Sequence, residues 1–205
     1  MEYLDPFGAD ELSVTISELL VATADSSDPL LDDSVSQLLH AMRQRMAMDV
    51  VFVSEFIDGR RMFRYVDAAP GAPEIIAGDS SPLEESVCQR VVEGRVPELV
   101  RDLGAVPKDQ LPEIPFRIGA HLSTPIVLAD RSVYGTLCCF SAAPRPELVQ
   151  ADMDRLKMCA TLVARKVALN KAQGIKEPPP DWKLQPQAEY DPAGWKKASP
   201  RSAGR

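Results

Sequence analysis

The segment Gly119–Phe140, GAHLSTPIVLADRSVYGTLCCF, constrains the fold more than any other stretch of the chain. Residues 120–128 and 132–140 are rich in β-branched and aromatic side chains, which are typical of strands. The short polar sequence Ala129-Asp130-Arg131 between them suits the turn of a hairpin. Side chains alternate across a strand, and here both faces of each strand carry apolar residues. We therefore predict a hairpin at the centre of a sheet that is covered on both sides.

One face of this hairpin mixes polar with apolar side chains. By alternation His121 and Ser123 share a face of the first strand, and Thr136, Cys138 and Phe140 share a face of the second. Such a mixture predicts a small polar cavity against that face of the sheet.

Two more strands and two helices are expected around the hairpin. Asp58-Gly59 is a strong hairpin signal, and the residues before it (49–57) and after it (60–68) have strand composition. Residues 147–172 carry apolar side chains three or four positions apart, which predicts a long amphipathic helix. Another helix is expected to begin at Asp32 or Asp33, either of which can cap it.

The segment between these strands carries a helix signal and several prolines. Ser81-Pro82-Leu83-Glu84 has the form of a capping box and predicts a helix from Ser81 to Glu93, ended by Gly94. Residues 95–100 read as a short strand. Three prolines in 103–117 predict an irregular loop, and a loop of that length is often a lid.

The strand with Pro125 followed by Val133-Tyr134-Gly135-Thr136-Leu137 resembles the closing strands of GAF domains, where a small-x-Pro-[IL] strand leads to a [VI]-[YW]-G-x-[LI] strand. SPLEESVCQRVVEGRVPELVRD (81–102) extends the resemblance, which covers about residues 33–171. It is nearest to bacterial signalling GAF domains found beside cyclic-di-nucleotide phosphodiesterase or cyclase modules. The resemblance implies an α/β (α+β) fold with a central antiparallel sheet of five or six strands and helices on both faces. It also implies homodimerisation through the helical layer.

The expected domain organisation is a helical extension over 1–30, the GAF-like sensory domain over 31–174 and a proline-rich, disordered tail over 175–205. Trp182 and Trp195 lie in that tail. They are anchors for a groove on this domain, on its dimer mate or on a separate protein partner, or they are incidental linker residues. A net charge of −7 argues against a nucleic-acid surface, and no apolar run is long enough to span a bilayer. Without a signal peptide or a disulfide framework, a cytoplasmic protein is expected.

The resemblance places the ligand cavity on the polar face of the sheet. Cys88 borders the cavity or is simply a small buried residue. His121 lines it, or its ring is satisfied by a backbone carbonyl, and ligation of haem iron is a remote alternative. Arg117 pairs with an anionic ligand or is a solvated loop charge. The expected ligand-binding residues are Phe52, Ser54, Cys88, Arg117, His121, Ser123, Thr136, Cys138 and Phe140.

No catalytic motif and no metal-ligand spacing was found, so neither catalysis nor a metal site is expected. The cysteines that free methionine sulfoxide reductases use, the Cys-His of bilin-binding forms and the Asn-Lys-Phe-Asp-Glu signature of mammalian cyclic-nucleotide GAF domains are missing too. The expected function is therefore a non-catalytic sensory module that binds a small molecule and signals to a partner. There are two alternatives. One is a thiol-based redox sensor or reductase that uses Cys88, alone or with Cys138, and the other is an adaptor with a filled pocket.

Overall fold

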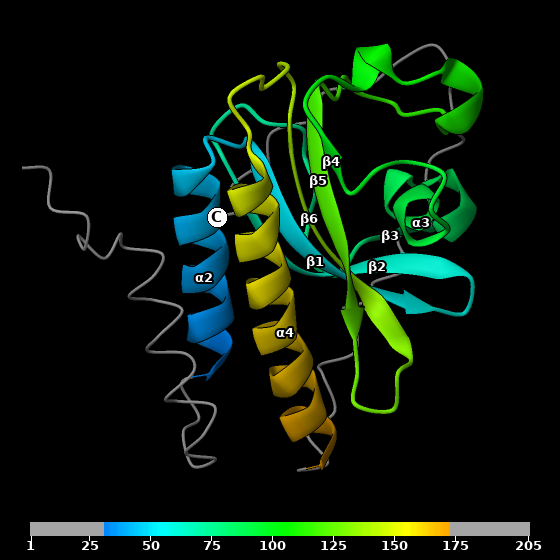
Figure 1. Ribbon diagram of the computed structural model, residues 1–205. Coiled ribbons are helices and arrows are strands. Elements are labelled where there is room, and N and C mark those ends of the chain that lie inside the picture. Colours follow the sequence, from blue (N-terminus) through cyan, green and yellow to red (C-terminus); the bar gives the residue numbers. More distant parts are fainter. Residues whose placement is uncertain (1–30, 173–205) are drawn as a thin grey trace, which may run out of the picture.

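Six antiparallel strands form one sheet in the computed structural model, which describes residues 31–172 of the chain (Figure 1). Their order across the sheet is β3-β2-β1-β6-β5-β4, so the hairpin predicted from residues 120–140 lies near its centre. The strands are β1 (Val50–Ile57), β2 (Arg60–Ala68), β3 (Ser80–Pro82), β4 (Leu99–Val100), β5 (Ala120–Val127) and β6 (Val133–Ser141).

The two predicted hairpins, β1–β2 and β5–β6, are both confirmed. In the first turn Asp58 and Gly59 have positive φ angles of 50° and 71°, as a type I′ turn requires. Such a turn matches the natural twist of the flanking strands, so a two-residue connection suffices. The first hairpin then pairs with the second through β1 and β6.

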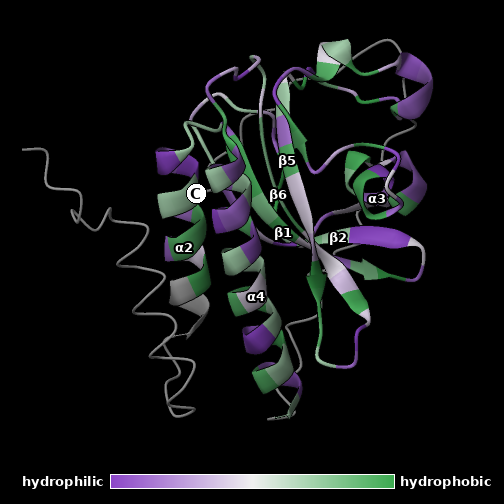
Figure 2. Ribbon diagram, viewed as in Figure 1, coloured by the Kyte–Doolittle hydropathy of each residue, from purple (hydrophilic) through white to green (hydrophobic). Residues whose placement is uncertain are grey.

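Two helices cover one face of the sheet, α2 (Leu31–Arg45) and α4 (Gln150–Ala172), which lie side by side in Figure 1. Their apolar stripes pack on the sheet residues that point toward them, for example Val51, Leu137 and Cys139. Figure 2 shows β1 and β6 coloured hydrophobic along most of their length. This side of the sheet is therefore the main hydrophobic core.

The opposite face carries a thinner cover made of α3 (Val87–Val92) and three short 3-10 turns (Figure 1). The turns are η1 (Leu83–Glu85), η2 (Leu103–Ala105) and η3 (Lys108–Gln110). The last two lie in the proline-containing segment expected to be irregular. Short elements cannot seal a sheet as long helices do, so this face has room for a cavity.

The predicted helix from Ser81 to Glu93 is wrong in its first half. Residues 80–82 form β3 and pair with Arg60–Met62, and α3 begins only after Ser86. The Ser86 hydroxyl accepts the backbone N–H of Gln89, so it is the true N-cap. Ser81 is part of a strand and not of the helix because its backbone pairs with Arg61 at the edge of β2.

The predicted helical extension over residues 1–30 and the tail with Trp182 and Trp195 lie outside the described residues. Within residues 31–172, no helix has the length and apolar character needed to cross a membrane.

Candidate functional site

Strand register lines up the predicted polar face in rows that run across three strands. Phe52 of β1 is paired with Cys138 of β6, which is paired with Ser123 of β5. In the neighbouring row His121 stands opposite Phe140. Because side chains that share a row and a face lie next to one another, the sheet itself brings a thiol, a hydroxyl and an imidazole together.

Cys88 reaches this surface from the covering layer. It lies in the first turn of α3, between Val87 and Gln89, and the Ser86 cap fixes where that helix begins. Its side chain is only 1% exposed and packs with Phe52 and Cys138. The short helix thus places a second thiol directly over the sheet.

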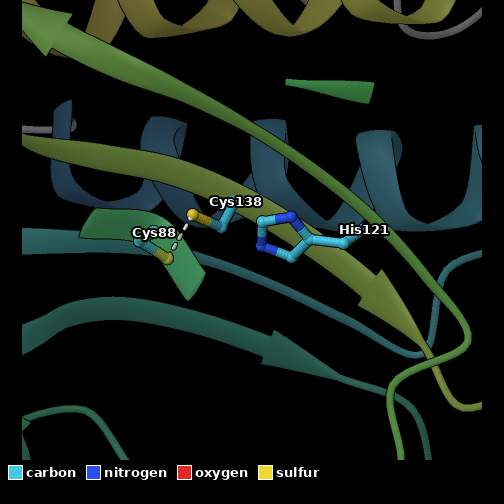
Figure 3. Close-up of side chains that lie close together, drawn as sticks. All are labelled: Cys88, His121 and Cys138. Atoms are coloured by element: carbon cyan, nitrogen blue, oxygen red, sulfur yellow. Dashed lines mark hydrogen bonds between the residues drawn. The ribbon is translucent and has the colours of Figure 1, made fainter. Parts of the chain in front are cut away.

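Cys88, Cys138 and His121 form a buried cluster (Figure 3). The sulfur atoms of Cys88 and Cys138 are 2.8 Å apart, and the edge of the imidazole ring farthest from the backbone of His121 faces them. The two sulfurs and one ring nitrogen all lie within 4.8 Å of one another. Each of the three comes from a different element, α3, β6 or β5.

Polar neighbours surround the two sulfurs. The Ser123 hydroxyl lies 2.8 Å and the Thr136 hydroxyl 3.2 Å from the sulfur of Cys138. An Nη1 N–H of Arg61 points at the sulfur of Cys88 from 3.5 Å. A chain of polar contacts therefore runs from the interior of the sheet to a guanidinium at the side of the site.

These surroundings separate the acidities of the two thiols. Burial alone would raise the pKa of Cys88, but contacts with Cys138 and His121 and the charge of Arg61 hold that pKa well below its usual value. Burial and the neighbouring Cys88 raise the pKa of Cys138 well above its usual value. The pair therefore favours one thiolate and one thiol, with the negative charge on Cys88.

A cavity of about 280 Å³ lies above the cluster, and Cys88 and His121 form part of its floor. Its apolar walls include the rings of Phe52, Phe63, Phe116 and Phe140. The rings of Phe116 and Phe140 are stacked with centroids 5.5 Å apart, while Phe52 and Phe63 meet edge to face at 5.1 Å. Apolar walls around a few polar groups are the usual make-up of a small-molecule site.

Two nitrogens in the cavity wall have no hydrogen-bond partner among the described residues. They are Nε of Arg61 and Nδ1 of His121, and both are buried. The guanidinium of Arg61 lies over the ring of Phe63, 4.7 Å from its centroid, so its position is fixed by packing. Buried polar groups without partners are costly, which makes these two nitrogens natural contacts for a ligand.

Charge is distributed unevenly around the cavity. The carboxylates among its lining residues are all exposed at its rim and belong to Glu74, Asp79, Glu85 and Glu113. Arg61 is the cation among the same lining residues. The entrance is thus acidic, while the inner wall offers N–H donors and sulfur.

The residues expected to bind a ligand fall into three groups. Phe52, Cys88, His121 and Phe140 line the cavity. A second group lies buried on the same face of the sheet but is not part of the lining: Ser54, Ser123, Thr136 and Cys138. Arg117 is exposed and is also not among the lining residues.

Arg61 was missed from the sequence. An arginine next to a hairpin turn normally reads as a solvated charge. Alternation did hold a signal, because Arg61 is two positions before Phe63 and so shares its face of β2. Cys139 and Cys159 differ from Cys88, since both are buried in the core between the sheet and the helices.

Comparison with family models matches residues 30–168 to the GAF domain. Among solved structures, the GAF domain of an Acinetobacter phosphoenolpyruvate-protein phosphotransferase is 16% identical with a TM-score of 0.61, covering 78% of this chain and 93% of its own. A phycoerythrobilin-bound GAF domain from a cyanobacterial phytochrome is 13% identical with a TM-score of 0.61, covering 80% and 97%.

A putative GAF sensor protein from Burkholderia vietnamiensis is also similar, with 14% identity and a TM-score of 0.56, covering 75% of this chain and 93% of its own. A search of curated proteins found no match. At such identities the likeness concerns the fold, and the ligands of these relatives do not transfer to this cavity.

Proposed function

The chain belongs to the GAF domain family, and on that premise we propose that it is a sensory module that binds a small molecule in the cavity over β1, β6 and β5. GAF domains are typically sensory or regulatory modules, which is the general class of function supported here. The observation that carries the specific proposal is the pair of buried nitrogens without partners, Nε of Arg61 and Nδ1 of His121.

The class of ligand follows from the shape and the hydrogen-bonding groups that the cavity walls can accommodate. The contiguous aromatic surface made by Phe63, Phe52, Phe140 and Phe116 favours a flat apolar body. The Arg61 guanidinium favours a carboxylate or another hydrogen-bond acceptor. A volume of about 280 Å³ admits one or two fused rings and little more. We therefore propose a small aromatic carboxylate or a compound of equivalent shape and polarity.

A thermal-shift and calorimetry series tests this proposal. The probes are benzoate, 2-naphthoate and the uncharged 2-naphthamide, each added to the full chain. Binding of 2-naphthoate in preference to 2-naphthamide is expected, with the preference lost in Arg61→Met, which keeps most of the apolar stem. The matched control Arg60→Met changes an exposed arginine next in the chain. Equal binding by wild type and Arg61→Met would contradict the proposal.

Transmission of the signal is proposed to run through β6. Cys138 faces the cavity side and its neighbour Cys139 packs against the helices, so a shift of β6 on ligand binding reaches α4. The homodimer and the partner that receives the signal are parts of the same proposal. Native mass spectrometry tests the first, because it gives the oligomeric state of the protein with and without ligand.

Thiol oxidation is a second candidate function, favoured by the 2.8 Å contact between the sulfurs of Cys88 and Cys138. A hydroperoxide is the oxidant. Its O–O bond breaks when the Cys88 sulfur attacks, which leaves a sulfenic acid on Cys88 and releases water or an alcohol. The Cys138 sulfur then attacks the Cys88 sulfur, the disulfide forms, and the hydroxyl leaves with the Cys138 proton as water.

Intact-mass measurement after titration with hydrogen peroxide tests this second candidate. The expected result is loss of two hydrogen atoms per chain, reversed by dithiothreitol and abolished in Cys138→Ala but retained in Cys139→Ala. A mass increase from oxygen atoms added to the cysteines, without disulfide formation, would rule out this second candidate. The third alternative, an adaptor with a filled pocket, is not favoured because the cavity is open.

A further inference from the structure

The cluster on the cavity floor has the donor set of a soft metal site. We propose that Cys88, His121 and Cys138 bind a thiophilic d¹⁰ cation, Zn²⁺ or Cu⁺. Thiolate and imidazole are the ligands that both ions prefer, and two sulfurs with one nitrogen is a known set for zinc with an open position. The two proposals share His121, but this inference does not rest on the proposed aromatic ligand, since it is argued from the two sulfurs and the ring nitrogen that lie within 4.8 Å of one another.

The three donors converge and are removed from water. Exposure is 1% for Cys88, 2% for His121 and 0% for Cys138. Their ligand atoms lie within 4.8 Å of one another, although they come from α3, β5 and β6. The ring edge of His121 that faces the two sulfurs is the one farthest from its backbone, so the nitrogen on that edge is the one placed to ligate an ion (Figure 3).

Neighbouring groups are placed to support such an ion. Ser123 and Thr136 hydrogen-bond the sulfur of Cys138, and Arg61 approaches the sulfur of Cys88. Partners of this kind orient metal ligands and tune their charge. With Zn²⁺ the two thiolates make a neutral centre, and with Cu⁺ the guanidinium of Arg61 compensates the remaining negative charge.

The acidic rim gives a cation a path to the floor. Glu74, Asp79, Glu85 and Glu113 concentrate cations at the entrance of the cavity. Because Cys88 and His121 also line the cavity, a fourth coordination position would open toward it. A small molecule in the cavity would then lie next to the ion.

The sulfurs must move slightly apart to hold the ion. At a metal–sulfur distance of about 2.3 Å, tetrahedral geometry separates two sulfurs by about 3.8 Å, and they now lie 2.8 Å apart. A rotation of one side chain about its Cα–Cβ bond is enough for a change of this size. The short helix α3, at the thin cover of the sheet, is the element best able to adjust.

Metal titration of the full chain tests the proposal. Protein stripped with a chelator under anaerobic, reducing conditions is titrated separately with Zn²⁺ and with Cu⁺, each against a competing chromophoric chelator. One ion per chain is expected, and the relative affinities show which ion the site prefers. X-ray absorption of the wild-type complex is expected to show two sulfurs and at least one nitrogen around the metal, a result independent of any variant.

Two adjacent cysteines provide a matched pair of variants. Cys138→Ala removes a proposed ligand, while Cys139→Ala removes an equally buried thiol on the other face of the same strand. We expect affinity to fall at least about 100-fold in the first and to stay within a few-fold in the second. Circular dichroism confirms that both are folded.

Three results would overturn the metal site. They are no ion retained against the competing chelator, equal affinities of Cys138→Ala and Cys139→Ala, or a sulfur count other than two in the wild-type complex. Formation of a Cys88–Cys138 disulfide without metal retention would overturn it in favour of thiol oxidation. None of these results bears on 2-naphthoate binding through Arg61, so the two proposals fail separately.

Discussion

Gly135 of β6 lies against the backbone of Ser54 in β1 so closely that a Cβ at position 135 would come within 1.9 Å of the Ser54 carbonyl oxygen. The two strands pair at this point, with Glu55 opposite Gly135. Since the obstructing atoms are backbone, they cannot move aside as a flexible side chain can. The glycine in Tyr134-Gly135-Thr136 is therefore needed for the contact between the two hairpins and for the row of residues beneath the cavity.

Gly135→Ala is expected to destabilise the protein by about 3 kcal/mol or more, because the added methyl group forces β1 and β6 apart. Chemical denaturation measures this loss. Gly94→Ala is the matched control: Gly94 has a φ of +72° and a Cβ added there would meet nothing within 4 Å, so only the left-handed backbone is penalised, by about 1 kcal/mol. Similar losses in the two variants would contradict the steric argument.

Ser86→Ala is expected to destabilise the protein by about 1 kcal/mol, because it removes the hydroxyl that caps α3. Ser81→Ala should cost less, since Ser81 lies in β3 and its hydroxyl only accepts an N–H from Arg61. Urea denaturation of the two variants gives the order of the losses. A larger loss for Ser81→Ala than for Ser86→Ala would instead support Ser81 as the N-cap, as the sequence predicted.

Hairpins were predictable here because their signals are local. Asp58-Gly59 supplies the positive φ angles that the turn needs, and strand alternation placed His121 and Cys138 on one face. The start of α3 was not predictable, because Ser81 and Ser86 both suit an N-cap and only the pairing of β3 with β2 decides between them. Local patterns can be read from sequence, but competition between two local patterns is resolved by tertiary contacts.

The candidate site shows the same division. Alternation groups residues on a strand, yet it does not say which loop or helix covers them. Cys88 and Cys138 were both expected at the cavity, but the direct contact between their sulfurs depends on where α3 lies. Arg61 and Arg117 illustrate the second difficulty. An arginine side chain is long and its direction depends on its packing partners, and the rings of Phe52 and Phe63 hold Arg61 at the cavity.

His121→Ala is expected to weaken binding of 2-naphthoate by about 1–3 kcal/mol, the scale of a lost charge-assisted hydrogen bond. Global stability should change far less, because the imidazole leaves a space that is continuous with the cavity. Calorimetry gives the affinity and urea denaturation the stability. As a control, His40→Ala removes an exposed histidine on α2 and should leave binding unchanged. An unstable variant that binds normally once folded would make His121 a core residue instead.

The stability of the protein should fall in alkaline solution, in part through Cys159. Burial raises the pKa of Cys159 to about 12, whereas an unfolded chain ionises its cysteines near pH 8.5. The folded state thus retains a proton that the unfolded state has lost, so this contribution is complete below about pH 8.5 and disappears as the pH rises toward 12. One such proton changes the free energy of unfolding by about 1.4 kcal/mol per pH unit.

A plot of the free energy of unfolding against pH should therefore have a shallower slope for Cys159→Ala than for wild type between pH 9 and pH 10.5. The expected difference in slope is about 1.4 kcal/mol per pH unit, whatever the absolute stability of the variant. Urea denaturation across this range measures both slopes, with Thr161→Ala, an exposed position on the same helix, as the control. Parallel profiles for wild type and Cys159→Ala would show that this thiol ionises as readily in the folded protein as in the unfolded chain.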